Sequence, residues 1–320
     1  MVTVLVAGSA VLAAGGGVAV ADVPVRTGWL PNCGGDYFKP CEGEPYRLLM
    51  RDGRWVKLPD AARYATKADG SRAGEAEDGP SPLEVSGDGR AIAYFRAGDG
   101  RLVVRRGPGG KPVVLPAYGE GAGTAHVRLL LSADGRRLLV DFSDAAKRRD
   151  GVVVDTSSGR TLRGVPAGDR ALGFSADGDE VLATRDRPDR TVQVVVHRLR
   201  GGSHAVTPPQ EVVIHHTALA LAADGRTLLA LLPQGLTSEK APQQVRRYDL
   251  RRGAWLGHGR VVGPRYGAGS LEWGPNGRLR LVRELGDMGA ASFWIHALDP
   301  VTGKTRRLDA YEIAATGPVK

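Results

Sequence analysis

Aromatic residues make up only 6% of this 320-residue sequence, and cysteine occurs twice. With so few aromatic side chains, a buried core has to be built from the Val, Leu and Ala that crowd the short apolar runs. The two cysteines do not suit a closed zinc site, because Cys33 and Cys41 lack the further Cys or His ligands that such a site needs. We therefore expect no metal ion and no other cofactor.

Catalytic motifs are also missing. The G-x-S-x-G nucleophile elbow does not occur, and only about a dozen residues follow the last repeat described below, so we expect no attached hydrolase domain. The D-x-D-x-D spacing of a calcium loop is absent. His215 and His216 are adjacent and would point to opposite faces of a strand, so a shared metal is not expected. The other histidines considered are scattered, at His197, His204, His258 and His296.

Charge is present in excess of one sign. The sequence has 44 Lys and Arg against 35 Asp and Glu, a formal net charge of +9. Such an excess favours contact with anionic surfaces. No Lys/Arg run alternates with stacking aromatics, and no zinc-finger, RRM or homeodomain pattern is present, so nucleic acid is not an expected partner.

The first 21 residues predict export. No charged residue lies between Val2 and Ala21, and Ala19-Val20-Ala21 before Asp22 has the small-x-small pattern of a signal peptidase site. The basic residues that usually start a signal peptide are missing, and a stretch of ~20 apolar residues is also long enough for an uncleaved membrane anchor. Gly and Ala make it a poor anchor, and no Cys follows for lipid attachment. We predict a secreted or envelope protein.

Cysteine usage agrees with export. Cys33 and Cys41 lie in an N-terminal segment, residues 22–45, and an even pair in an oxidising compartment predicts a disulfide. Closing so short a loop stabilises a fold by about 2–3 kcal/mol in the chain-entropy model.

Five segments share one pattern: an apolar run, a small residue, Asp-Gly or Asn-Gly, and a second apolar run. They are LEVSGDGRAIAYF from Leu83, LLLSADGRRLLVDF from Leu129, LGFSADGDEVLAT from Leu172, LALAADGRTLLALL from Leu219 and LEWGPNGRLRLVREL from Leu271. Their turn glycines recur every 43 to 52 residues, at Gly89, Gly135, Gly178, Gly225 and Gly277. This period is close to the ~40–45 residues of a propeller blade.

The turn residues explain the pattern. Asp-Gly and Asn-Gly tolerate positive φ, which the two-residue type I′ hairpin turn requires. We assign the polar residue of each pair to turn formation rather than to calcium, because such side chains bond their own backbone two residues on; these residues are Asp88, Asp134, Asp177, Asp224 and Asn276. A second strand pair follows each hairpin, which gives four strands, A to D, per blade.

One further strand pair, YRLLMRDGRWVKLP from Tyr46, stands alone and resembles strands C and D. Because propellers often close by completing a blade from both chain ends, we predict an all-β propeller over residues 46–320 with six blades. One blade is composite, with Tyr311–Ile313 as the contributor from the tail. Five or seven blades are the alternatives. The polar segment 61–82 is predicted to be an exposed loop.

The S-x-D-G-R element, seen as SGDGR at Ser86 and SADGR at Ser132, resembles the PD40 repeat of TolB and of the propeller domains of prolyl-oligopeptidase-like peptidases. The resemblance covers nearly all of the chain after the leader and implies a β-propeller. The GH and WD dipeptides of true WD40 repeats are missing. The family includes both translocation scaffolds and peptidase lids, so the resemblance does not define a function.

Two functional hypotheses follow. The favoured one is a monomeric, exported, non-enzymatic module that presents one ring face to a protein, a glycan or an anionic envelope component. The A–B and C–D turns would share one rim and give it a basic face that includes Arg90, Arg136, Arg226 and Arg278. The alternative is a small-molecule enzyme, lactonase-like or another hydrolase, with its site in the central channel. The inner strands there are mostly apolar, and Glu84 and Glu272 are their only carboxylates, at equivalent positions in the first and fifth units.

Overall fold

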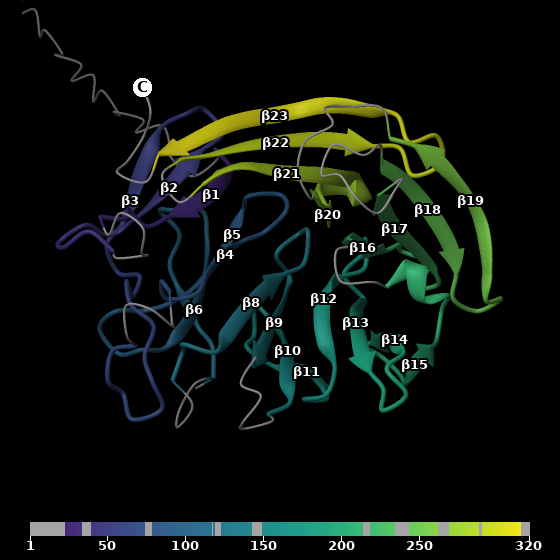
Figure 1. The fold of residues 1–320 in the computed structure, drawn as a ribbon. Coiled ribbons are helices and arrows are strands. Elements are labelled where there is room, and N and C mark those ends of the chain that lie inside the picture. Colours follow the sequence, from purple (N-terminus) through teal and green to yellow (C-terminus); the bar gives the residue numbers. More distant parts are fainter. Residues whose placement is uncertain are drawn as a thin grey trace, which may run out of the picture.

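The structure is a computed structural model that describes residues 23–33, 40–73, 79–116, 118, 123–142, 149–213, 218–233, 243–261, 269–287 and 290–314. The predicted leader, His215 and His216 lie outside these residues. Six antiparallel sheets form six blades around a central axis (Figure 1). No helix in the described ranges is long and apolar enough to cross a membrane.

Each blade is a sheet of strands that are consecutive in the sequence. Blade 1 contains β1 (Val25–Trp29), β2 (Tyr46–Met50) and β3 (Trp55–Leu58); blade 2 contains β4 (Leu83–Val85), β5 (Ala91–Phe95), β6 (Leu102–Arg106) and β7 (Val113–Val114); blade 3 contains β8 (Val127–Leu131), β9 (Arg137–Phe142), β10 (Gly151–Asp155) and β11 (Thr161–Val165). Blade 4 contains β12 (Arg170–Phe174), β13 (Glu180–Asp186), β14 (Val192–Arg198) and β15 (Ser203–Val206); blade 5 contains β16 (Ala218–Leu221), β17 (Thr227–Pro233), β18 (Gln243–Asp249) and β19 (Ala254–Arg260); blade 6 contains β20 (Gly269–Trp273), β21 (Leu279–Asp287), β22 (Ala290–Leu298) and β23 (Thr305–Ala314). Two short 3-10 segments, η2 (Gln210–Val212) and η3 (Pro275–Gly277), complete the described elements.

The five predicted repeats are blades 2 to 6, so the all-β, six-bladed prediction is confirmed. The prediction of how the ring closes is wrong. Tyr311–Ile313 do not complete blade 1, because β23 is paired with β22 along its whole length, with Tyr311 opposite Phe293. Blade 1 instead takes its third strand, β1, from the segment 22–45 that precedes the predicted propeller.

The strand β1 runs in the opposite direction to the inner strands of the other blades. Its first residue lies at the rim of the A–B turns, where the Val25 N–H donates to the Gly89 carbonyl at 2.8 Å. At the other rim, the Tyr46 hydroxyl donates to the Ser81 carbonyl, just before β4 begins. In direction and order, β1, β2 and β3 therefore correspond to strands B, C and D. Among the described residues, blade 1 has no inner strand A.

Apolar side chains hold neighbouring blades together at five contacts. Representative buried pairs, from the contact of blades 1 and 2 to that of blades 5 and 6, are Leu48 and Ile92, Phe95 and Leu138, Leu139 and Val181, Leu182 and Leu228, and Leu231 and Leu281. Burying one such side chain contributes about 1.5–3 kcal/mol. These contacts explain why a sequence poor in aromatics still supports the ring.

The contact that closes the ring, between blades 6 and 1, is polar in the part of the chain that the structure describes. The Arg26 Nε lies 2.9 Å from the Asp309 carboxylate, and the same guanidinium lies 5.9 Å from the centre of the Tyr311 ring. Arg280 reaches past blade 1 and donates to the Gly87 carbonyl of blade 2 at 3.0 Å. Closure therefore depends on charge and hydrogen bonds rather than on an apolar cluster.

The A–B turns are longer than predicted in all five blades, with five residues between the two strands. Asp88, Asp134, Asp177 and Asp224 do not have positive φ, so these turns are not type I′; only Asn276 and Gly277, at φ 60° and 65°, meet that requirement. The longer turn is closed by side chains. The Asp88 carboxylate accepts from the Arg90 N–H at 2.9 Å, and the Ser86 hydroxyl accepts from the Ala91 N–H at 2.9 Å. The same bonds recur at Ser132, Asp134, Ser175 and Asp177.

The turn glycines also permit close contact between blades. Gly135 has a φ of +66°, and a Cβ added there would lie 2.4 Å from the Cβ of Ala91 in blade 2. A Cβ at Gly89 would lie 2.2 Å from the Val25 carbonyl oxygen of blade 1. The repeat therefore selects glycine both for backbone conformation and for space.

The N-terminal disulfide is confirmed: Cys33 and Cys41 are bonded, with their Cα atoms 4.9 Å apart. The segment 61–82 is only partly exposed. Ala61 and Ala65 are buried, and the Thr66 N–H donates to the Thr124 hydroxyl at 2.9 Å. Small alanines let a polar segment pack over the rim, which its charge content alone did not indicate.

Candidate functional site

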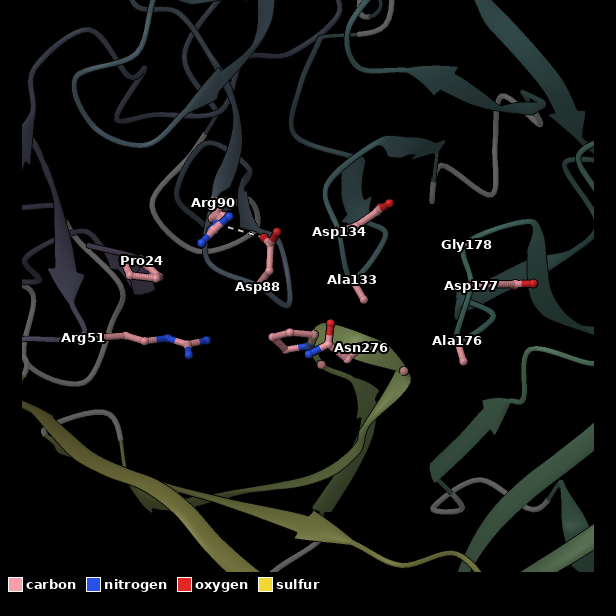
Figure 2. A pocket seen from close by; sticks show the side chains of 13 residues that line it. Pro24, Arg51, Asp88, Arg90, Ala133, Asp134, Ala176, Asp177, Gly178 and Asn276 are labelled. Atoms are coloured by element: carbon pink, nitrogen blue, oxygen red, sulfur yellow. Dashed lines mark hydrogen bonds between the residues drawn. The ribbon is translucent and has the colours of Figure 1, made fainter. Parts of the chain in front are cut away.

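The A–B and C–D turns meet at one rim, and the mouth of the central channel opens between them. A cavity of about 520 Å³ occupies this mouth. It is lined by A–B turns of blades 2, 3, 4 and 6, and by Pro24 and Arg51 of blade 1. Figure 2 shows Arg51 and Arg90 on one side of the opening, Asn276 near its centre and Asp177 on the other side.

At the mouth, the arginine side chains form fewer interactions within the protein than the aspartate side chains do. Within the described ranges, Arg51 and Arg90 are exposed and their guanidinium groups form no ion pair. The Asp88 and Asp134 carboxylates, by contrast, accept backbone N–H bonds that hold their own turns. A ligand that enters the mouth therefore meets these two guanidinium groups beside three aspartate carboxylates, Asp88, Asp134 and Asp177.

The predicted basic face divides into free and paired arginines. Arg278 is exposed at the rim, like Arg90, whereas the exposed Arg136 lies 3.5 Å from the Asp134 carboxylate. Arg226 donates to the buried Asp249 carboxylate through Nε and one terminal nitrogen, Nη2, and this arginine holds the pKa of the Asp249 carboxyl well below its usual range. Its positive charge is therefore paired with Asp249 and stabilises the turn between β16 and β17.

Two arginines at the end of β6 connect blades. Arg105 extends inward to Asp60 of blade 1 at 2.7 Å. Arg106 donates to the Asp134 and Gly135 carbonyls of blade 3, each at 3.1 Å. Some of the arginines that give the sequence its positive charge therefore hold neighbouring blades together.

The channel presents polar as well as apolar groups. A cavity of about 230 Å³ is lined by the inner strands of blades 2 to 6, with leucines such as Leu131, Leu172 and Leu219. No described residue of blade 1 lines it. This agrees with the missing strand A of that blade.

Glu84 and Glu272, predicted as channel residues, both line this cavity. Burial raises the pKa of the Glu84 carboxyl to about 8, and the negative charge of Glu272 adds to the shift; the Leu131 N–H and Arg128 act in the opposite direction. Glu84 keeps some access to channel water but is surrounded by protein, which is why its charged form is disfavoured. The Glu272 carboxylate lies 3.5 Å from the Arg280 guanidinium.

A third cavity, of about 260 Å³, lies beside the channel. Its walls are β1, β4 and the face of blade 6 that turns toward blade 1. Glu84, Glu272 and Arg280 line both this side cavity and the channel. The two spaces therefore adjoin each other between β4 and β20.

The histidines do not form a metal site in the described residues, which contain no group of three or more potential ligands. His197 is buried, and its ring nitrogens lie 2.7 Å from the Ser203 hydroxyl and 2.7 Å from the Asp169 carboxylate. Burial lowers the pKa of His197, against the influence of Asp169. Asp169 is also bound by Arg185, and Ser203 lies on the last strand of blade 4, away from all three cavities. We assign this cluster to the stability of blade 4.

Sequence reasoning missed Arg51 and Arg280. The segment RDGR at Arg51 marks a C–D turn, but its approach to the mouth depends on how blade 1 meets the ring. Arg280 reaches the channel because the turn of blade 6 leans on blade 2: a Cβ added at Gly87 would lie 2.5 Å from the Trp273 carbonyl oxygen. Neither contact is local in sequence.

No family model matches the sequence, and no curated protein matches it. Among solved structures, TolB from Acinetobacter baumannii is similar with a TM-score of 0.45 and 15% identity, over 80% of this chain and 57% of TolB. The Cps50 (Swd1) β-propeller domain of Myceliophteria thermophila gives 0.41 and 16%, over 75% of this chain and 73% of the domain. The acylaminoacyl peptidase of Pyrococcus horikoshii gives 0.46 and 14%, over 89% of this chain and 46% of the peptidase. The chain spans about half the length of TolB and of the peptidase, and the likeness is one of fold.

Proposed function

We propose that this chain is an exported, non-enzymatic binding module that holds an anionic partner at the mouth of its channel. One observation carries the proposal: a cavity of about 520 Å³ opens at the rim where Arg51 and Arg90 have no ion-pair partner among the described residues. Guanidinium groups in a partly enclosed cleft attract carboxylates and phosphates more strongly than the same groups on an open surface.

The rim is held in place before any partner binds. The Asp88 N–H donates to the Ala133 carbonyl of the next blade at 2.8 Å, and the Ala176 N–H donates to the Leu221 carbonyl at 3.1 Å. A surface that is already ordered loses little conformational entropy on binding. This favours a binding role for the rim.

Export is supported by the apolar stretch before Asp22 and by the disulfide between Cys33 and Cys41. The partner would then belong to the envelope or to the extracellular space. N-terminal sequencing of the protein recovered outside the cytoplasm tests this part: a start at Asp22 is expected, and retention of the whole chain inside the cell contradicts it.

The binding proposal is tested with the chain that begins at Asp22. We expect a short polyglutamate peptide, polygalacturonate or phosphatidylglycerol vesicles to bind at low salt and to be released as salt rises. The double variant Arg51→Glu with Arg90→Glu should weaken binding by about tenfold or more. The matched control, Arg101→Glu with Arg187→Glu, makes the same charge change in the B–C loops of the opposite rim and should bind like the parent. Equal losses in both variants, or no binding of any probe, would reject the proposal.

The alternative, an enzyme with its site in the channel, is favoured by one observation. Glu84 and Glu272 line the same cavity, and the raised pKa of Glu84 is typical of a group that donates a proton. Turnover of lactone, ester or glycoside substrates that is lost in both Glu84→Gln and Glu272→Gln would establish this alternative. The binding proposal expects no turnover by the parent chain.

A further inference from the structure

The channel contains an acidic side chain that no cation of the described structure neutralises. Glu84 lies in the middle of β4, the inner strand of blade 2, and lines both the channel and the side cavity. Among the described residues, no Lys or Arg forms an ion pair with it, whereas Glu272 is paired with Arg280 at 3.5 Å. The Leu131 N–H of β8 is directed at the Glu84 carboxyl, which also has access to channel water.

The other charged groups around Glu84 largely balance one another. Those that face this region from neighbouring elements are paired, Arg280 with Glu272, Arg128 with Asp141 and Arg26 with Asp309, and Arg51 and Asp88 lie at the mouth. When Glu84 is ionised, its own negative charge therefore has no counter-ion inside the channel. One monovalent cation beside it would restore the balance.

A proton neutralises Glu84 when no such cation is bound. Burial raises the pKa of its carboxyl to about 8, and the negative charge of Glu272 adds to the shift. A cation that binds beside the carboxylate has to displace this proton. Binding of the cation and release of the proton are therefore coupled.

The rest of the channel favours a small cation that carries an apolar group. Leu131, Leu172 and Leu219, from three other inner strands, are half-buried and line the same cavity. Each inner strand has a sheet partner on its outer side only, so its free edge presents carbonyl oxygens toward the axis. At about 230 Å³, the cavity is smaller than the usual pocket for a drug-sized molecule.

We propose that the channel binds a small primary alkylamine, with its ammonium group beside Glu84 and its apolar chain among the leucines of the inner strands. An ammonium group has three donors, which match the carboxylate and the carbonyls of the strand edges. The Glu272 carboxylate lines the same cavity and adds to the attraction. The mouth gives access to this site, because Ala133 lines both spaces. The site does not involve Arg51 or Arg90 and is independent of the anionic partner proposed above.

The probe is n-hexylamine, titrated into the full chain by calorimetry. We expect its affinity to rise about tenfold per pH unit between pH 6 and pH 7 and to level off above about pH 8, because the proton competes with the amine for Glu84. Binding heats in phosphate and in Tris buffer at pH 7 should differ by the heat of releasing about one proton per amine. The uncharged n-hexanol should bind about tenfold more weakly or worse, and release no proton.

Two outcomes of this titration would overturn the inference. One is no saturable binding of n-hexylamine at pH 8, or binding without proton release at pH 7. The other is displacement of n-hexylamine by an equal concentration of calcium chloride, which would assign the site to a metal ion.

Protein variants locate the site. Glu84→Gln keeps the shape of the side chain but cannot ionise, so it should weaken n-hexylamine binding by about tenfold or more and abolish proton release. The matched control Glu211→Gln, at an exposed position of η2 in a D–A connection of the opposite rim, should bind like the parent chain. Unchanged binding in Glu84→Gln contradicts the assigned site.

A second pair of variants tests the apolar part of the site. Leu172→Trp places a large side chain in the channel and should abolish binding of n-hexylamine, whereas Leu256→Trp, at an exposed position of β19, should preserve it. Binding that survives Leu172→Trp contradicts a site in the channel. The Arg51→Glu with Arg90→Glu variant should bind the amine at least as well as the parent, so failure at the mouth and failure in the channel are distinguishable.

Discussion

Glu84 shows how burial changes the behaviour of a single residue in this fold. Its carboxyl pKa rises from 4.5 to about 8 because protein surrounds it and Glu272 lies nearby. A carboxyl whose pKa is higher in the folded than in the unfolded state binds its proton more tightly when folded. The fold is therefore favoured at low pH, and its stability falls as the pH rises from about 4.5 to about 8.

The corresponding prediction concerns Glu84→Gln. The parent chain should lose about 1–3 kcal/mol of unfolding free energy between pH 5 and pH 8 through this group, less than the full shift implies because channel water and arginines screen it. The glutamine variant should lose measurably less over the same range in urea titrations. Asp69→Asn, at an exposed loop position, serves as the control and should leave this part of the pH profile unchanged. Parallel pH profiles for the parent and Glu84→Gln would contradict the burial of the carboxyl.

Glycine is needed at Gly135 for two reasons: the positive φ of the turn and the lack of space for a Cβ. Two substitutions can separate these effects. Gly135→Ala adds a Cβ in a positive-φ turn and places it against Ala91, so we expect a loss of about 2–4 kcal/mol. Gly100→Ala has the same φ requirement, at +67°, but open space around it, and should cost about 1 kcal/mol. Thermal unfolding of both variants measures the difference. Equal losses would show that the blades do not approach as closely at Gly135 as the structure indicates.

At the scale of elements, the positions of the turns were predictable, but their type and the closure of the ring were not. Blades 2 to 6 are marked by Asp-Gly or Asn-Gly with a strand on each side, and such hairpins are specified within a dozen residues. The strand β1, with the sequence VRTGW, pairs with β2 across a separation that includes the disulfide loop, and no local signal announces that pairing. We assigned Tyr311–Ile313 to the wrong blade for the same reason. The pairing of β23 depends on its register with β22, and the sequence of β23 alone does not indicate that partner.

In the candidate site too, some residues were predictable from the sequence and others were not. Glu84 and Glu272 were identified from the sequence because they occupy equivalent positions of two repeats. We predicted Arg226 on a binding face, but it forms an ion pair with Asp249. The sequence did not indicate this pair, because only the folded turn brings the buried carboxylate close to Arg226. Arg51 was overlooked because its place at the mouth depends on how the first blade sits against the others.

The two kinds of contact between blades should differ in strength. Leu48→Ala removes a fully buried side chain from the apolar contact of blades 1 and 2, with an expected cost of about 2–5 kcal/mol. Arg26→Ala removes the ion pair with Asp309 at the closure of blades 6 and 1, and should cost only about 1 kcal/mol. Urea unfolding of the two variants measures both. A larger loss for Arg26→Ala would contradict the view that closure is the weaker contact.

For the whole molecule, the arrangement is a ring held by five apolar contacts and one polar contact, with a mouth at one rim that is lined by two arginines and three aspartates. The side cavity, Arg51 and Arg90 all lie at blade 1 or at the blades beside it. The proposed binding site at the mouth therefore lies beside the polar contact that closes the ring.

The most direct test of the binding account is photo-cross-linking of an acidic peptide to the chain that begins at Asp22, followed by mass spectrometric mapping. The account predicts cross-links concentrated in the A–B turns of blades 2, 3, 4 and 6 and around Arg51, and their loss in 1 M salt, where screening extends only about 3 Å. Cross-links that fall mainly in the B–C loops of the opposite rim, or that persist unchanged in high salt, would contradict it.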